Sequence, residues 1–471
     1  MNNYLIMLKK SKLVVIILIG TIAFSFILSV TLDIGLAFLS FILFISVAIF
    51  QKSFHYGLIF FLGVILIFPS ISFFNGNITL QEIFISIIAL LGSANLILEG
   101  YKFKFLPLFY YWVGLIILTG LILISQNKYI WEIIYRLNFE YFIIIIVYPI
   151  IIILFQYFFQ TTKRLERFFL LIILAGFIQS LMNIIFATNN LFIVENILLQ
   201  KEALIVLIMV TAPTTLGMWL TQKNSLTTLK FLWLNKKKKN IYKFVDSILD
   251  NKHVEASKSI INLKKTRINR QNLLLFIFGV QILALIFTLS FIPLIIIGLG
   301  IFIMGVLLRN RNIILIVLSL LLLASIILPN IGMISNIQLK QEFIELFYNI
   351  KKFYSLQILW QGTFGQQLQQ ISNAYLFIFS KVGLIGLFIF ILGLIQYFKE
   401  IRNTYLKSDE FERIWIVVIL VIFIEFVILA MNSKAFFSWP AGLLFWILYG
   451  TLQNLKKSKK EYKLIESVIG N

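Results

Sequence analysis

Residues 13–30 read LVVIILIGTIAFSFILSV and contain no charged side chain. A helix crosses the hydrocarbon core of a bilayer with roughly 20 predominantly apolar residues, so this stretch predicts a membrane-spanning helix. It is longer than the hydrophobic region of a signal peptide, and no small-residue cleavage site follows it. We therefore expect it to be the first membrane helix and not a cleaved leader.

The rest of the chain has the same character. Of its 471 residues, 60% are hydrophobic and only 13% are charged, and the mean hydropathy is +0.96. A soluble domain carries about 25% charged residues, and its surface needs polar cover that this chain cannot supply. The composition excludes a soluble globular protein, a disordered chain and a coiled coil, and it predicts a polytopic membrane protein.

Apolar stretches of membrane-spanning length recur along the whole sequence, which predicts an all-α fold with fourteen transmembrane helices. The least certain pair is 272–308, where Pro293 marks either a turn or a kink; because proline favours the first turn of a helix, we divide the pair there. The expected spans are 13–30, 34–50, 55–73, 79–98, 105–124, 140–159, 168–187, 202–221, 272–290, 292–308, 312–329, 372–396, 414–431 and 437–453.

The basic residues predict the orientation. With both termini in the cytoplasm, alternate loops place all but eight of the 41 Lys and Arg residues inside, as the positive-inside rule requires. This bias accounts for the net charge of +21 without a nucleic-acid partner. The expected parts are an N-terminal bundle of about eight helices, a basic cytoplasmic loop, a C-terminal bundle with a large outer loop at 330–371, and a basic cytoplasmic tail. Their bounds are 1–221, 222–271, 272–455 and 456–471.

The outer loop is too long to be a simple connector. Within it, 338–356 has apolar residues at helical spacing, with Lys340, Lys351 and Lys352 on its polar side. One interpretation is a helix that lies in the membrane interface, where lysine pairs with glutamate or lipid phosphate. The other is a lid over a membrane cavity that directs cations toward a phosphate-bearing lipid.

Polar side chains inside predicted spans are costly and therefore mark candidate sites. Glu425 lies well inside the span 414–431, and Gln179 and Asn183 lie one turn apart on one helix face. Asn373 and Gln281 lie within spans or at their start. For Glu425 the alternatives are a functional role as a base, a proton relay or a sugar contact, and a protonated acid that is hydrogen-bonded between helices. The absence of cysteine and the presence of only two histidines argue against a metal centre, and no nucleotide-binding motif occurs.

The C-terminal part carries an ordered series of motifs. Arg309-Asn310-Arg311 comes first and Gly362-Thr363-Phe364-Gly365 second. After these come Ser372-Asn373-Ala374-Tyr375-Leu376 and Lys381-Val382-Gly383-Leu384-Ile385-Gly386-Leu387, and last the final span 438–450, SWPAGLLFWILYG. This order over 270–455 resembles the O-antigen ligase/polymerase superfamily, which includes the Wzy-type polymerases. There a G-x-G pair precedes His-Asn-x-x-Leu and then E-x-Gly-Leu-x-Gly. The family histidine is replaced by Ser372, and the predicted outer loop contains no arginine.

The resemblance implies a metal-independent glycosyltransferase in the bacterial cytoplasmic membrane, without a cofactor. Its substrates would be oligosaccharide repeat units on undecaprenyl pyrophosphate, in O-antigen, capsule or exopolysaccharide assembly, with membrane lipid and a chain-length regulator protein as further partners. Arg136, the only outer arginine, would hold the pyrophosphate together with Lys340, Lys351 and Lys352, and the catalytic candidates are Glu425 and Asn373. The missing histidine favours a polymerase over a ligase and also leaves open a member without activity. A lipid-linked oligosaccharide flippase is the alternative from another functional class.

Overall fold

A computed structural model of the chain shows an all-helical membrane protein. It describes 107–125, 146–159, 162–189, 203–222, 252–288, 291–319, 373–431 and most of 433–455, together with scattered residues between 62 and 97. In these residues the only strands are β1 (Ser72–Phe73) and β2 (Ile78–Thr79), which pair antiparallel. The predicted spans 13–30 and 34–50, most of 55–73 and 79–98, and the outer loop 330–371 lie outside the described residues.

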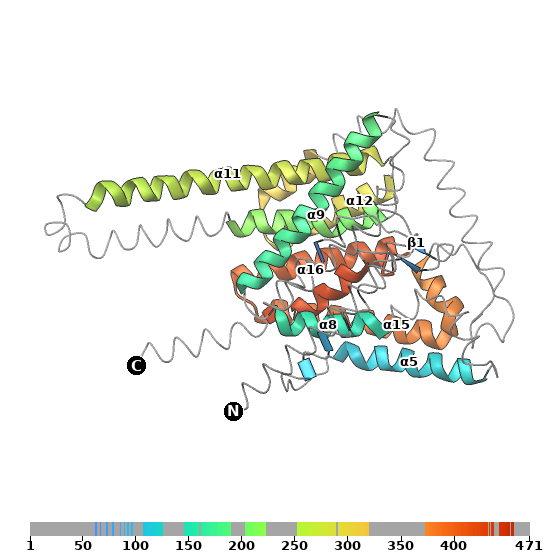
Figure 1. The fold of residues 1–471 in the computed structure, drawn as a ribbon. Helices are drawn as coiled ribbons and strands as arrows, with labels where there is room; N and C mark the ends of the chain where they lie inside the picture. The colour runs from blue at the N-terminus through green and yellow to red at the C-terminus, as the bar shows by residue number, and fades with distance from the viewer. Residues whose placement is uncertain are drawn as a thin grey trace, which may run out of the picture.

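The helices follow the apolar stretches of the sequence. Four contain a segment that is long and apolar enough to cross a membrane: Arg164–Ile185, Ala203–Gln222, Arg270–Phe287 and Ala374–Lys407. Residues 311–319 form a further helix, and so do residues Gly442–Leu452. The labelled helices are α5 (Pro107–Ser125), α8 (Tyr148–Phe158), α9 (Thr162–Asn189), α11 (Lys252–Phe287), α12 (Phe291–Leu307), α15 (Ala374–Lys407) and α16 (Glu410–Leu429) (Figure 1).

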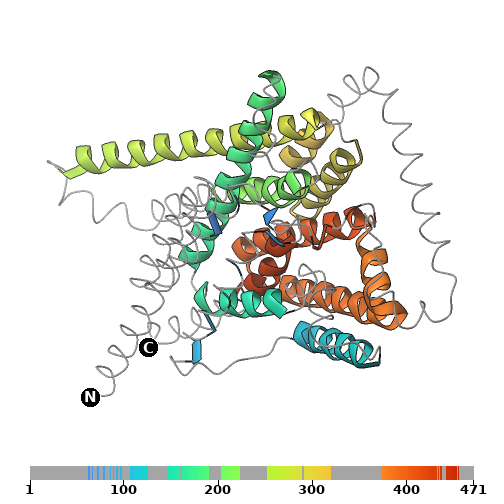
Figure 2. The ribbon, with the colours of Figure 1, turned by 45° about the vertical axis from the view of Figure 1, so that its right-hand side comes forward.

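The helix Ala203–Gln222 is almost completely buried, because 94% of its apolar stretch lies inside the structure. Among the labelled helices, α9 packs on α11, α12 on α16, and α5 on α15 (Figures 1 and 2). Other helices expose large apolar side chains, such as Tyr110 of α5, Phe276 of α11 and Phe388 of α15. Apolar residues on the outside and well-buried helices within are what a bundle surrounded by lipid tails requires.

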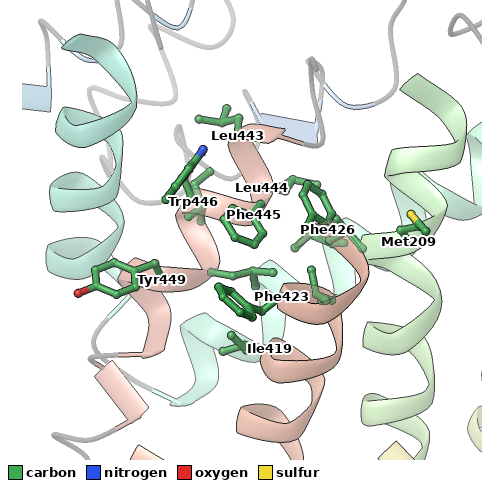
Figure 3. Packing of buried hydrophobic residues seen from close by; sticks show 14 of the residues in the cluster. Met209, Ile419, Phe423, Phe426, Leu443, Leu444, Phe445, Trp446 and Tyr449 are labelled. Atoms are coloured by element: carbon green, nitrogen blue, oxygen red, sulfur yellow. The ribbon is translucent and has the colours of Figure 1, made fainter. Parts of the chain in front are cut away.

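An aromatic cluster holds the C-terminal helices together (Figure 3). The Phe426 ring of α16 stacks on Phe445 with a centroid separation of 4.8 Å, and Phe445 meets Trp446 edge-on at 4.9 Å. Trp446 in turn packs edge-on against Trp112 of α5 at 5.1 Å. Aromatic pairs in these geometries contribute about 0.5–1.5 kcal/mol each beyond the area that they bury. The cluster therefore ties α5, α16 and Gly442–Leu452 into one unit.

Several helices continue beyond the hydrophobic stretches that predict them, α11 and α15 by the most. α11 begins at Lys252, so 252–271 of the expected cytoplasmic loop is helical and continuous with the span. In both views its first half extends beyond the other coloured helices (Figures 1 and 2). α15 continues past residue 396 to Lys407. Hydropathy marks where a helix leaves the membrane, whereas the helix itself ends only where its sequence offers a break or a cap.

The expected division near Pro293 is confirmed. α11 ends at Phe287 with Thr288 in a turn, and α12 begins at Phe291, which places Pro293 in the first helical turn. There its missing N–H group has no helical partner to lose.

Candidate functional site

Asn373 begins α15 as its N-cap. Its backbone is extended (φ −77°, ψ 127°), and its Oδ1 accepts hydrogen bonds from the N–H groups of Tyr375 (2.9 Å) and Leu376 (3.0 Å). The same side chain donates through Nδ2 to the carbonyl of Met431, just beyond α16. Both lone-pair directions of Oδ1 and one hydrogen of Nδ2 are therefore used within the protein. The role of Asn373 as a catalytic candidate stays a prediction, with one amide hydrogen left to bind a substrate.

The residues after Asn373 continue the connection to α16. The N–H of Ala374 donates to the carbonyls of Ala430 (3.0 Å) and Ser433 (3.2 Å). The hydroxyl of Tyr375 donates to the carbonyl of Val427 (3.0 Å). The last carbonyls of a helix have no partner inside the helix, so these bonds satisfy groups that would otherwise be unpaired. We call this arrangement the α15–α16 joint; its residues are Asn373, Ala374, Tyr375, Val427, Ala430, Met431 and Ser433.

Replacing Asn373 with alanine should destabilise the joint. Loss of an N-cap costs about 0.5–2 kcal/mol, and the carbonyl of Met431 loses its donor as well. Serine at this position keeps a cap but is too short to reach Met431, so Asn373→Ser should fall between the wild type and Asn373→Ala. Thermal denaturation in detergent measures this order. Equal midpoints for the three proteins would show that the joint contributes no stability.

α15 is broken at Gly383. This residue has φ 69° and ψ −168° in the middle of an otherwise helical segment, and Figure 2 shows α15 changing direction along its course. Side chains other than glycine rarely adopt a positive φ of this kind. One turn later, a Cβ on Gly386 would overlap the side chain of Val382. Asn373, Gly383 and Gly386, which all belong to the motifs behind the family resemblance, therefore occupy special positions in one helix.

Glu425 lies in α16 and is completely buried. Its carboxyl group rests against α12 at Gly300, where a Cβ would overlap Oε1 of Glu425. Among the residues that the structure describes, neither carboxyl oxygen has a hydrogen-bond partner. The hydrogen bond that one of the sequence-based alternatives expected between helices is thus not seen within these residues.

A second group of buried polar residues lies where α9, Ala203–Gln222 and α11 meet. The hydroxyl of Thr215 lies 3.2 Å from Oε1 of Gln281, and a Cβ on Gly176 of α9 would overlap the side chain of Thr211. Gln179 is buried and Asn183 is partly exposed. The threonines could not be recognised from the sequence as site residues. A threonine in a helix usually bonds to the backbone of its own helix, so its presence does not indicate a contact between helices.

The remaining predicted site residues are not placed. Arg136, Lys340, Lys351 and Lys352 lie outside the described residues. Within the described ranges, no group of three or more His, Asp or Glu residues could hold a metal ion.

Comparison with known proteins finds no matching family model, no matching curated protein and no matching solved structure. The family resemblance therefore depends on the motif residues of this chain alone.

Proposed function

We propose that this protein polymerises oligosaccharide repeat units carried on undecaprenyl pyrophosphate, at the outer face of the bacterial cytoplasmic membrane. The observation that carries the proposal is the geometry of α15. Asn373 caps the helix and bonds to the residues after α16, and Gly383 breaks the helix with a positive φ. The motif residues Asn373 and Gly383 thus occupy positions with special backbone geometry in α15, which supports the proposal.

The proposed reaction is a single glycosyl transfer. A sugar hydroxyl of one repeat unit attacks the anomeric carbon of the growing chain; a new C–O bond forms, and the bond from that carbon to the pyrophosphate oxygen breaks. The hydroxyl proton passes to a base or to water at the outer face. Outer cations, with Arg136 first, stabilise the charge on the departing polyprenyl pyrophosphate. The energy comes from the activated donor, so no nucleotide is needed.

The proposal includes the topology of fourteen spans with both termini in the cytoplasm. It is supported by the uneven distribution of basic residues over the expected loops. In this arrangement 222–271 faces the cytoplasm and 330–371 faces outward, where the lipid-linked substrate is presented.

Single cysteines test this topology, because the native chain contains none. Cysteine at Ser335 should react with an impermeant thiol reagent in intact spheroplasts, whereas cysteine at Ser257 should react only after the membrane is permeabilised. Labelling of the Ser257 position in intact spheroplasts would reverse the orientation and place the proposed outer site on the wrong side.

The activity is tested by the glycans of a strain that lacks the gene. Without a polymerase, the strain should make surface glycan with single repeat units in place of long chains, and the plasmid-borne gene should restore the long chains. Long chains that persist but fail to reach their acceptor would replace the proposal with a ligase. Unaltered glycan would remove the protein from this pathway.

A flippase is the second candidate function, because membrane helices that are broken part-way are also typical of transporters. The break at Gly383 in α15 is the observation that favours it. The same deletion strain separates the two functions: a missing flippase leaves repeat units on the cytoplasmic face, whereas a missing polymerase leaves them outside.

A further inference from the structure

We propose that Glu425 is a proton-binding site within the membrane that exchanges its proton at the contact between α12 and α16. The site consists of a fully buried carboxyl group on α16 that faces the backbone of α12 at Gly300. This inference does not depend on glycosyl transfer, and it holds for any function of the chain.

No described cation is available to neutralise a carboxylate at this position. α12 and the helix Ala203–Gln222 contain no Asp, Glu, Lys, Arg or His, and Gly442–Leu452 contributes only the phenol of Tyr449 as a titratable group. An unpaired charge in such surroundings is far more costly than a neutral acid. The buried carboxyl group therefore carries a proton at rest.

The charged groups on the neighbouring parts of α15 and α16 are engaged or distant. Arg413 is about 18 Å from Glu425 along the helix axis, at 1.5 Å per residue. Its guanidinium donates to the carbonyl of Ser408 and lies over the ring of Tyr405, 5.3 Å from the centroid. On α15, Lys381 lies over the ring of Phe377. The other charged residues of these two helices belong to their ends near the connection between them; they are Lys399, Glu400, Arg402, Lys407, Asp409, Glu410 and Glu412.

The proton of Glu425 is not held by a structural hydrogen bond among the described residues. Buried polar groups between membrane helices usually bond across the interface, as Asn373 does with Met431 and Thr215 with Gln281. Glu425 lacks such a partner there. Gly300 has no side chain, which leaves space for the carboxyl group but offers no side-chain acceptor for its proton. The carboxyl group therefore fits the site without a hydrogen bond that would hold its proton in place.

On the α12 side, the site lies behind a helix whose opposite face is partly exposed. On α12, Leu299 is 45% exposed and Phe302 is 42% exposed, whereas Gly300 between them faces Glu425. A small separation of α12 from α16 would therefore open the carboxyl group to the membrane interior. Glu425 also precedes Val427 by two residues, and the carbonyl of Val427 accepts a bond in the α15–α16 joint. Loss of the proton would place a charge beside that joint.

A membrane-permeant carbodiimide tests the site in the full-length protein reconstituted in lipid vesicles. The acid proton moves to a nitrogen of dicyclohexylcarbodiimide, the carboxylate adds to its central carbon, and an acyl shift leaves a stable N-acylurea. No other reactant is needed. We expect mass spectrometry to place the adduct on Glu425 in the wild type, and Glu425→Gln should lose it. A water-soluble carbodiimide should leave Glu425 unmodified.

Two glycine variants show whether the contact with α12 controls access. Alanine at Gly300 should force the helices apart and increase the rate of labelling, whereas a Cβ on Gly279 of α11 meets nothing within 4 Å, so Gly279→Ala should label as the wild type does. Wild-type protein without an adduct on Glu425 would overturn the proposal, because the acid would then be sealed and structural. Equal modification by the water-soluble reagent would also overturn it, because the site would then be open to water.

Discussion

Replacing Gly383 with alanine should destabilise the folded protein by roughly 1–3 kcal/mol, the cost of holding a non-glycine residue in a sparsely populated backbone region. At φ 69° and ψ −168° glycine adopts a conformation that an alanine Cβ opposes. The variant should either denature at a lower temperature in detergent or straighten α15. Straightening would separate Asn373 from Met431 and so open the α15–α16 joint.

Gly393→Ala is the matched control in the same helix. Gly393 has no positive φ, and a Cβ there would meet its nearest neighbour, Leu108, at 3.6 Å, an ordinary van der Waals contact. Its denaturation midpoint should remain at or slightly above that of the wild type, because alanine favours a helix over glycine. If Gly383→Ala matched Gly393→Ala, the break in α15 would not be a feature of the folded protein.

Arg136→Lys should lose most of the polymer while the protein is expressed and inserted normally. Arginine binds phosphate through a planar fork of donors, and lysine keeps the charge but not the two parallel bonds. Arg136 follows Tyr129, Trp131 and Tyr135, aromatic residues that favour the headgroup level where a pyrophosphate lies. Glycan chain length in a complemented deletion strain measures the loss.

Arg164→Lys, on the side expected to face the cytoplasm, is the control and should leave the polymer unchanged. An arginine that only anchors a span at the interface also tolerates lysine. Full-length polymer from Arg136→Lys would therefore remove Arg136 from the proposed site and leave Lys340, Lys351 and Lys352 as the candidates for the pyrophosphate.

Hydropathy alone predicted most of the described helices. The expected spans 105–124, 202–221 and 292–308 correspond to α5, Ala203–Gln222 and α12 within about two residues at each end, the usual uncertainty of helix boundaries. This agreement has a physical reason. A backbone in lipid must satisfy its own hydrogen bonds. The α-helix is therefore the structure that a single uninterrupted apolar stretch of sufficient length adopts.

Features that depend on contacts between helices could not be predicted in the same way. The motif around Gly383 gave no sign of the break with a positive φ that the structure shows there. Asn373 was a catalytic candidate, and its bonds to Met431 and to its own helix become visible only once α15 and α16 are placed together. Glu425 stood out as an intramembrane acid, but its contact with Gly300 depends on the packing of α12.

Charged residues led to several helices being predicted too short, most clearly α11 and α15. The basic residues before residue 272 suggested a loop, yet Lys and Arg are good helix formers, so α11 starts at Lys252. The same reasoning explains why α15 continues through Lys399 and Arg402 to Lys407. A change in hydropathy locates the membrane boundary and says little about where the helix stops.

Reconstitution of the purified protein in vesicles tests the proposed polymerase most directly. The substrate is the lipid-linked repeat unit extracted from the deletion strain, with no nucleotide added. We expect a ladder of glycans at multiples of the repeat unit, released polyprenyl pyrophosphate in matching amount, and a much weaker ladder with Arg136→Lys. Substrate that stays as single units, with folded wild-type protein and intact donor, would contradict the proposed function.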